Sequence, residues 1–114
     1  AKQLAPLRDD NILILGSGNI VHNLRLIDWD PDAEPLPWAA EFNQFFMSQL
    51  LANQHSHLLD WQGAGDAARL SIPTPEHYWP ALYPLALQGG GEQVEITCVA
   101  EHPAVHAADL EVSS

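Results

Sequence analysis

The six histidines are the residues of this chain best suited to acid–base or metal chemistry. A neutral imidazole takes up protons near physiological pH and coordinates metals. His55 and His57 lie at the end of a predicted helix, where residues two apart point about 200° away from each other. His102 and His106 have a spacing that binds metal on a helix, but Pro103 and the lack of a helical pattern oppose a helix there. We expect neither pair to form a site.

His22 follows a glycine turn at the end of a predicted strand. The apolar run Asn11–Leu15, which ends at Gly16-Ser17-Gly18, has the pattern of a strand buried on both faces. Side chains at the carboxyl ends of such strands line the ligand-binding crevice of open α/β sheets. A lone histidine is more often structural than catalytic, so position alone leaves both roles open for His22.

His77 lies in a proline-rich turn, PTPEH, just before a predicted helix. Pro75 and Pro80 restrict the backbone on either side, so this imidazole would lose little entropy on being positioned. The alternative is a helix-entry residue that packs under Trp79. The pattern alone does not separate these two interpretations.

Two common motifs are incomplete in this chain. The segment GSGNIV has the first two glycines of a dinucleotide-binding fingerprint, but Val21 occupies the position of the third. A nucleophile elbow requires GxSxG, and Leu15 stands where its first glycine should precede Ser17. Serine hydrolase chemistry is therefore poorly supported, and a nucleotide-binding module that uses the GSGN turn is the least favoured function.

The elements that would position these residues are mainly helices. A long helix is predicted over Trp38–Asn53, because Pro37 suits a first turn and apolar residues then recur at spacings of three and four. The stretch Asp28–Pro37, rich in proline and acids, is a predicted surface loop. A further helical turn is predicted at Leu58–Trp61, followed by a loop that runs to Ser71.

The last third of the chain predicts one helix and one strand. An apolar helix should begin near Tyr78 or Trp79, and Pro84 inside it costs about 3 kcal/mol or bends it, so we expect a bent or shortened element. The alternation over Val94–Cys98 predicts a half-buried strand. From Glu101 to Ser114 no pattern predicts a structure.

Composition indicates one soluble domain and excludes several partners. The chain has 114 residues, of which 46% are hydrophobic and 17% charged, and no apolar run approaches the ~20 residues of a membrane-spanning helix. A net charge of −11 repels nucleic acids and anionic membranes.

Cys98 is the single cysteine, which fits a reducing compartment, and Ala1–Asp10 has no signal-peptide pattern, so we expect a cytoplasmic protein. Ala1–Asp10 reads as the tail of a helix, which indicates a piece of a longer protein.

Three segments together resemble a known enzyme family. LAPLRDDNILILGSGNIVHNLR (Leu4–Arg25), WAAEF (Trp38–Phe42) and IPTPEHYWPALY (Ile72–Tyr83) are similar to the C-terminal half of the 4,5-DOPA extradiol dioxygenases, which are class III extradiol ring-cleaving dioxygenases. The match runs over Leu4–Gly91 in consistent order. The most specific feature of this resemblance is that a GSGNxVHN turn and a TPEHYxP turn occur in the same sequence.

The resemblance implies a fold and an activity. The fold would be α/β, with a partial sheet flanked by helices over residues 1–114 as the C-terminal portion of a larger single domain. The activity would be the opening of a catechol ring by molecular oxygen at non-haem Fe(II), with Zn(II) as an occasional occupant. His22 corresponds to the active-site histidine that acts on the substrate hydroxyl and can approach the metal, and His77 corresponds to a metal ligand.

The sequence also departs from the family pattern, and these departures change the activity that we expect of this chain. Pro84 interrupts a helix that is continuous in the family, and the tail Glu101–Ser114 lacks the usual closing strand. The family's other two metal-site histidines belong to an N-terminal half that is absent here. Two histidines do not complete a three-ligand centre, so this chain alone should bind iron weakly and be inactive. It would then pair with that missing half or form a homo-oligomer. The alternative is an inactive stand-alone remnant that acts as an oligomeric binding module.

Overall fold

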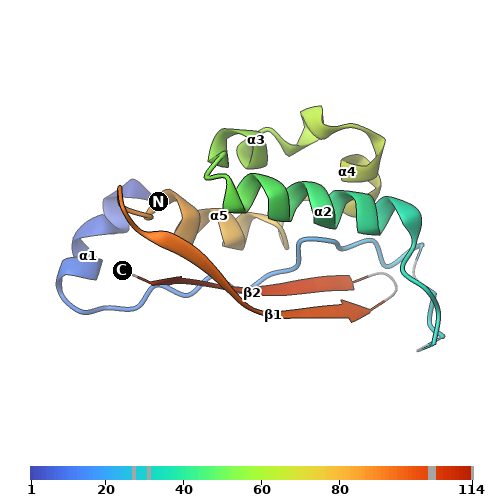
Figure 1. Ribbon diagram of the computed structural model, residues 1–114, viewed down its shortest axis with the longest axis horizontal. Coiled ribbons are helices and arrows are strands. Elements are labelled where there is room, and N and C mark those ends of the chain that lie inside the picture. Colours follow the sequence, from blue (N-terminus) through green and yellow to red (C-terminus); the bar gives the residue numbers. More distant parts are fainter. Residues whose placement is uncertain (27, 31, 103–104, 114) are drawn as a thin grey trace.

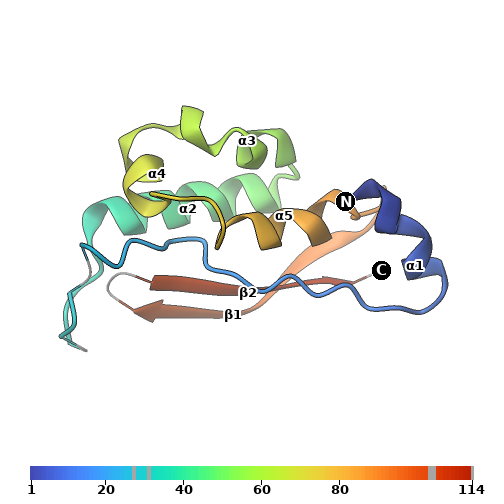
Figure 2. The same ribbon diagram turned by 180° about the vertical axis from the view of Figure 1, so that it is seen from behind.

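The computed structural model describes the backbone of residues 1–26, 28–30, 32–102 and 105–113, with side chains as far as residue 96. The helices form one side of the molecule, and a two-stranded hairpin forms the other (Figure 1). The same two layers are seen from behind in Figure 2. The elements in chain order are a 3-10 turn (Lys2–Leu4), α1 (Ala5–Asp9), α2 (Pro37–Leu51), α3 (His55–Leu59), a second 3-10 turn (Trp61–Ala64), α4 (Asp66–Ser71), α5 (Trp79–Ala86), β1 (Gln93–His102) and β2 (Val105–Ser113).

Helix α2 provides one face of the core. A proline opens it, as predicted, because the missing amide proton is not needed in a first turn. Its buried residues recur at spacings of three and four: Ala39, Phe42, Phe46 and Leu50. The expected helix is therefore confirmed, and it ends two residues earlier than predicted.

Two short helices, α3 and α4, contribute buried side chains to the core. The predicted turn near Leu58 is α3, and Leu58 is fully buried. The loop expected up to Ser71 is wrong, because Asp66–Ser71 forms α4, with Ala67, Ala68 and Ser71 buried. Six residues are too few to show a helical period in the sequence.

None of the described helices has the length and apolar character needed to cross a membrane.

Helix α5 begins at Trp79 and is short, as expected. Pro84 lies inside it and cannot donate the helical hydrogen bond to the carbonyl of Pro80. That carbonyl instead lies against the backbone of Gly16, where an added Cβ would be 2.2 Å from the oxygen. The helix continues through Pro84 and ends at Ala86.

The hairpin pairs β1 with β2 in antiparallel register, from Gln93 opposite Ser113 to His102 opposite Val105, with an irregularity between Ile96 and Cys98. Val94 and Ile96 pack against the core, so the predicted half-buried strand is confirmed where side chains are described. The expectation that the tail lacks a closing strand is wrong, since β2 occupies it.

The predicted strand at Asn11–Leu15 is absent, which corrects the expected α/β arrangement. The segment is extended but unpaired, and Leu13 and Leu15 are 65% and 78% exposed. The described elements are mostly helical, and the hairpin is the one sheet among them. An apolar run predicts burial on two faces, but a strand forms only where a neighbouring strand is present. The described residues supply no such neighbour.

Candidate functional site

The structure brings His22 and His77 together. Their ring centroids are 3.8 Å apart, and the ring planes are inclined by 32°. His22 is partly buried, whereas His77 is exposed. The imidazole rings of His22 and His77, which come from distant segments of the sequence, thus lie next to each other.

The two segments meet backbone to backbone. The amide of Asn19 donates a hydrogen bond to the carbonyl oxygen of His77 over 2.7 Å. A Cβ added at Gly18 would lie 2.1 Å from the same oxygen. The glycines of the GSGN turn therefore permit close approach to the entry of α5. This role gives the glycines a structural explanation that needs no bound nucleotide.

Helix α4 holds the His22 turn from the other side. The amide of His22 donates to the carbonyl of Ser71, and the side-chain amide of Asn23 donates to the carbonyl of Leu70, both over 2.7 Å. The Asn23 side-chain oxygen accepts a bond from the amide of Arg25 over 3.2 Å. The expected place of His22 at a sheet edge is wrong, because no strand precedes it; the ends of two helices position it instead.

A tight turn fixes His77. The carbonyl of Pro75 accepts bonds from the amides of Tyr78 and Trp79, each over 2.9 Å. Tyr78 is buried, and its hydroxyl donates to the carbonyl of Leu58 over 2.7 Å. The alternative that His77 packs under Trp79 is not what the structure shows, since Trp79 is 52% exposed and the ring beside His77 is that of His22.

The surroundings keep His22 neutral. Burial lowers its pKa, the charge of His77 lowers it further, and Glu76 opposes both. The Nδ1 atom of His22 is buried without a hydrogen-bond partner among the described residues. The pKa of Glu76 is also lowered, first by a backbone hydrogen bond, then by Thr74 and by the two histidines. These effects favour the neutral form of His22, whose Nδ1 is buried and has no partner among the described residues.

These donors fit a metal only in part. Neutral imidazoles suit iron and zinc, and the unpartnered Nδ1 of His22 is a nitrogen that such an ion would satisfy. Within the part of the chain that the structure describes, however, no group of three or more His, Cys, Asp or Glu side chains could hold a metal. The two imidazoles by themselves are therefore fewer than the three donors of such a group.

An open cleft of about 640 Å³ adjoins His22. Its wall combines apolar side chains with two guanidinium groups and polar residues of the His22 turn. The lining residues are His22, Asn23, Leu24, Arg25, Leu26, Arg69, Leu70, Pro73 and Thr74. Sequence reasoning missed this cleft, because α4, which supplies part of its wall, was predicted as a loop.

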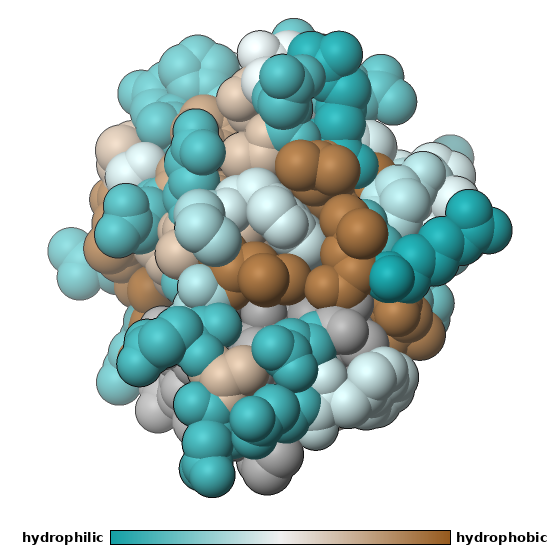
Figure 3. Space-filling model, turned by 90° about the vertical axis from the view of Figure 1, so that its right-hand side faces the viewer, coloured by the Kyte–Doolittle hydropathy of each residue, from teal (hydrophilic) through white to brown (hydrophobic). Residues whose placement is uncertain are grey.

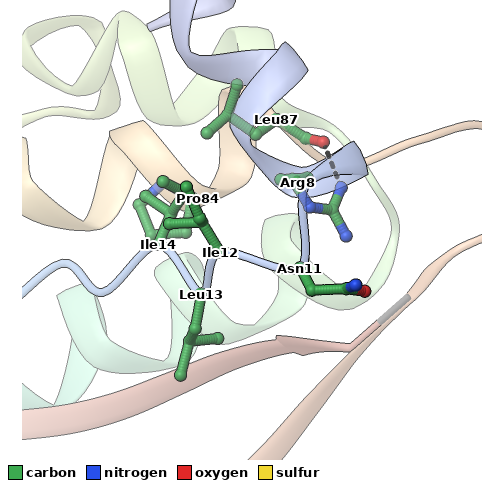
Figure 4. Close-up of a pocket in the computed structure, with 7 residues that line it drawn as sticks. All are labelled: Arg8, Asn11, Ile12, Leu13, Ile14, Pro84 and Leu87. Carbon is green, nitrogen blue, oxygen red and sulfur yellow. Dashed lines mark hydrogen bonds between the residues drawn. The ribbon is translucent and has the colours of Figure 1, made fainter.

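A second pocket, of about 250 Å³, lies beside α1 and the end of α5 and includes neither site histidine (Figure 4). Arg8 donates there to the carbonyl of Leu87 over 2.6 Å. Its guanidinium also forms two hydrogen bonds to the carboxylate of Glu92, over 2.9 and 2.7 Å. This contact ties the N-terminal helix to the start of the hairpin. It was not predicted, because 84 residues separate the partners.

The remaining histidines form no common site among the described residues. His55 bonds Gln88, and His57 bonds Gln49, so the two rings face different partners, as expected. Their expected place at the end of a helix is wrong, because α3 begins at His55. His102 and His106 lie on β1 and β2, where the helical spacing of four has no meaning. Their side chains lie outside the described part.

Comparison with known proteins identifies relatives. No protein-family model matches the chain. It is 43% identical over 101 residues to a 4,5-DOPA dioxygenase extradiol of Escherichia coli K12, covering 83% of this chain and 36% of that protein. Proteins of the same name from Portulaca grandiflora and Beta vulgaris are 33% and 28% identical, over 81% and 82% of this chain and 33% and 34% of theirs.

A solved structure has the same fold. It is the crystal structure of the uncharacterized protein JW3007 from Escherichia coli K12, with a TM-score of 0.87 and 36% identity over 98% of this chain and 47% of that one. The chain spans about a third of the length of its curated relatives. Over the residues that it covers, the chain is similar to 4,5-DOPA extradiol dioxygenases.

Proposed function

We propose that this chain is the C-terminal part of a metal-dependent extradiol dioxygenase that opens a catechol-type ring with molecular oxygen. The observation that carries the proposal is the contact between His22 and His77, with ring centroids 3.8 Å apart, in a chain similar to these dioxygenases. Two converging imidazoles give the site both an acid–base group and a metal ligand.

His22 is the proposed acid–base group. A catechol must lose a proton before its two oxygens can chelate a metal, and a neutral imidazole at hydrogen-bond distance can accept that proton. The lowered pKa of His22, which favours the neutral ring, supports this role. The protonated ring can later return the proton to an oxygen of the opening ring. Because the two rings lie side by side, His22 would also be near a metal held by His77.

His77 is the proposed metal ligand. Its exposed ring is held by the turn that follows Pro75, so the backbone fixes the direction of approach. A second group usually fixes the tautomer of a metal-bound histidine, and Glu76, whose pKa both rings lower, is a candidate for that group. When bound, non-haem Fe(II) supplies the redox chemistry that dioxygen requires, and Zn(II) is the proposed alternative occupant.

The complete site would need polypeptide from outside these residues. A catalytic iron centre of this kind has three protein ligands on one face, and two are present. The exposed Leu13 and Leu15 support the same conclusion, since strand-forming apolar residues are normally covered. We propose that these leucines pack in a larger α/β domain, against the N-terminal half of the parent protein or against a further chain. The cytoplasm is the proposed location of that protein. Self-association of the isolated chain is the second way to cover them.

The rival function is an inactive remnant that binds partners as an oligomer. The same exposed apolar segment favours it, because unpaired strands associate edge to edge. The two functions differ in what the chain does inside a full-length protein. An enzyme part restores turnover there, whereas a remnant does not.

A chimera separates them. This chain replaces the matched part of the E. coli relative, and oxygen uptake is followed with a panel of catechols. The proposal predicts uptake of one O₂ per ring-opened product. A His77→Ala chimera should lose this activity, and a His57→Ala chimera should keep it, because His57 bonds only Gln49. A well-folded, metal-loaded chimera without uptake on any catechol would favour the remnant.

A further inference from the structure

The hydroxyl of Ser71 is buried without a hydrogen-bond partner. Among the described residues, Asn23 and Ser71 are the two buried polar ones. The side-chain amide of Asn23 has partners on both its nitrogen and its oxygen. Ser71 is 0% exposed, and its Oγ atom has no partner among the same residues. A buried hydroxyl without a hydrogen bond costs free energy, so native folds nearly always supply one. A partner for Ser71 must therefore lie close to it in the fold.

His22 lies directly beside Ser71. The amide of His22 donates a hydrogen bond to the carbonyl oxygen of Ser71 over 2.7 Å, which holds the two backbones in contact. The Nδ1 atom of His22 is also buried and has no partner among the described residues. These two atoms are complementary, because a hydroxyl oxygen accepts a hydrogen bond from a ring N–H. A rotation about χ1 of Ser71, or one internal water, would join them.

The surrounding elements hold the two residues together. Ser71 is the last residue of α4, which packs against α2 (Figure 1). Figure 3 shows apolar residues gathered among hydrophilic ones on the face at this end of the molecule. The bond from Asn23 to the carbonyl of Leu70 ties the His22 turn to the same helix. A hydrogen bond between groups so buried is electrostatically stronger than one exposed to water.

The direction of a bond between His22 and Ser71 would decide what His22 offers to the cleft that it lines. A neutral imidazole carries one N–H, and the hydrogen bond at one nitrogen decides which nitrogen is protonated. When Nδ1–H donates to the serine oxygen, Nε2 keeps its lone pair. That nitrogen can then accept a proton or coordinate a metal.

We propose that Ser71 is a positioning residue for His22: its hydroxyl oxygen accepts a hydrogen bond from Nδ1–H, directly or through one water, and so keeps Nε2 of the neutral ring unprotonated. In this arrangement Ser71, instead of an ion, satisfies Nδ1. The hydrogen bond stands on the burial and the backbone contact of the two residues. Its consequence for catalysis rests on the proposed function, in which His22 needs an accepting nitrogen.

The test measures the ¹⁵N chemical shifts of the His22 ring in the 114-residue chain, with a chelator present, at about pH 9, where an ordinary imidazole is neutral. Protonated and unprotonated ring nitrogens give separate shifts, and His22→Asn assigns the signals. We expect the Nδ1–H form in the unchanged chain and a change toward the Nε2–H form in Ser71→Ala. Ser71→Thr, which keeps a hydroxyl, should keep the Nδ1–H form. Ser48→Ala removes an exposed hydroxyl that bonds the carbonyl of Phe45, and it should leave the ring signals unchanged.

The stability of the chain gives a second measurement, in which the two arrangements differ in sign. If Ser71 bonds His22, Ser71→Ala leaves Nδ1 unpaired and should lower the folding equilibrium constant about fivefold, which corresponds to about 1 kcal/mol. If the hydroxyl has no partner, its removal should raise that constant. In a His22→Ala background the loss caused by Ser71→Ala should disappear, because the partner is gone.

The outcomes separate this inference from the proposed function. Ring signals that do not respond to Ser71→Ala, an Nε2–H form in the unchanged chain, or a more stable Ser71→Ala chain would each overturn the hydrogen bond. In the chimera, Ser71→Ala should lower kcat about tenfold and leave KM unchanged. An altered ring form with unchanged kcat would overturn the positioning role. A Ser71-dependent ring form in a chimera that turns over no catechol would support the hydrogen bond and refute the dioxygenase.

Discussion

The amide of Asn19 donates a hydrogen bond of 2.7 Å to the carbonyl oxygen of His77. This bond joins the turn that carries one site imidazole to the turn that carries the other. Gly18 lies against the same carbonyl, so the two turns are in direct backbone contact. The geometry of the histidine pair therefore depends on backbone contacts more than on the imidazoles themselves.

Gly18→Ala should disrupt the site by steric clash. The new Cβ would lie 2.1 Å from the His77 oxygen, so one backbone segment must move. We expect a loss of about 1–3 kcal/mol in the free energy of unfolding, as for other overpacked positions. Urea denaturation measures the loss, and NMR contacts between the two imidazole rings should weaken. Gly90→Ala is the matched control, since nothing lies within 4 Å of its added Cβ. Equal stability of the two variants would contradict the account.

Tyr78→Phe should destabilise the chain through one buried hydrogen bond. The Tyr78 hydroxyl donates to the carbonyl of Leu58, and burial raises the pKa of the phenol well above its usual value. Removing the hydroxyl leaves that carbonyl unpaired, which costs about 1–3 kcal/mol. Thermal or chemical denaturation reports the change. Tyr83→Phe, at a side chain that is 50% exposed, should change stability little, and a similar loss there would argue against this explanation.

Acid should weaken the contact between α1 and the hairpin. The hydrogen bonds from Arg8 lower the pKa of Glu92 from 4.5 to about 2. A carboxylate with a lowered folded-state pKa stabilises the fold fully above pH 4.5, and this contribution is lost as the pH falls toward 2. Urea midpoints measured from pH 6 to pH 2 should drop less steeply for Glu92→Gln than for the unchanged chain. Parallel curves would show that the pair does not couple to folding.

Serine substitutions of Leu13 and Leu15 should affect stability differently in the isolated chain and in the chimera. In the isolated chain both are largely exposed, so Leu13→Ser and Leu15→Ser should change stability by no more than about 0.5 kcal/mol. Phe46→Ala, in the core, should cost about 3–5 kcal/mol in the same assay. In the chimera the two leucines should be covered, and the same serines should then cost about 2–5 kcal/mol, the range for truncated core leucines. Equal small effects in both settings would contradict a covered strand.

Sequence reasoning predicted elements that carry their own periodicity. The spacing of Phe42, Phe46 and Leu50 predicts α2, and the alternation of Val94 and Ile96 predicts β1, because each pattern repeats over several residues. Helix α4 was missed because it is too short to repeat, and β2 because the tail has no clear pattern.

Neighbours determine the features that the sequence could not predict. Asn11–Leu15 has the composition of a buried strand, but pairing depends on a second strand, which no local pattern encodes. The contact of His22 with His77 was expected only through the family resemblance. In the structure the pair is accompanied by the close approach of Gly18 to the His77 carbonyl, a packing detail between residues far apart in the sequence. The cleft beside His22 depends in the same way on α4.

The most direct test of the central claim measures metal content and turnover together in the chimera. His77→Ala should lose the metal and the activity with it. His22→Ala should keep most of the metal and lose about 10²–10⁴-fold in turnover, as expected for removal of a general acid–base. Full metal occupancy and full oxygen uptake in His77→Ala would contradict the account.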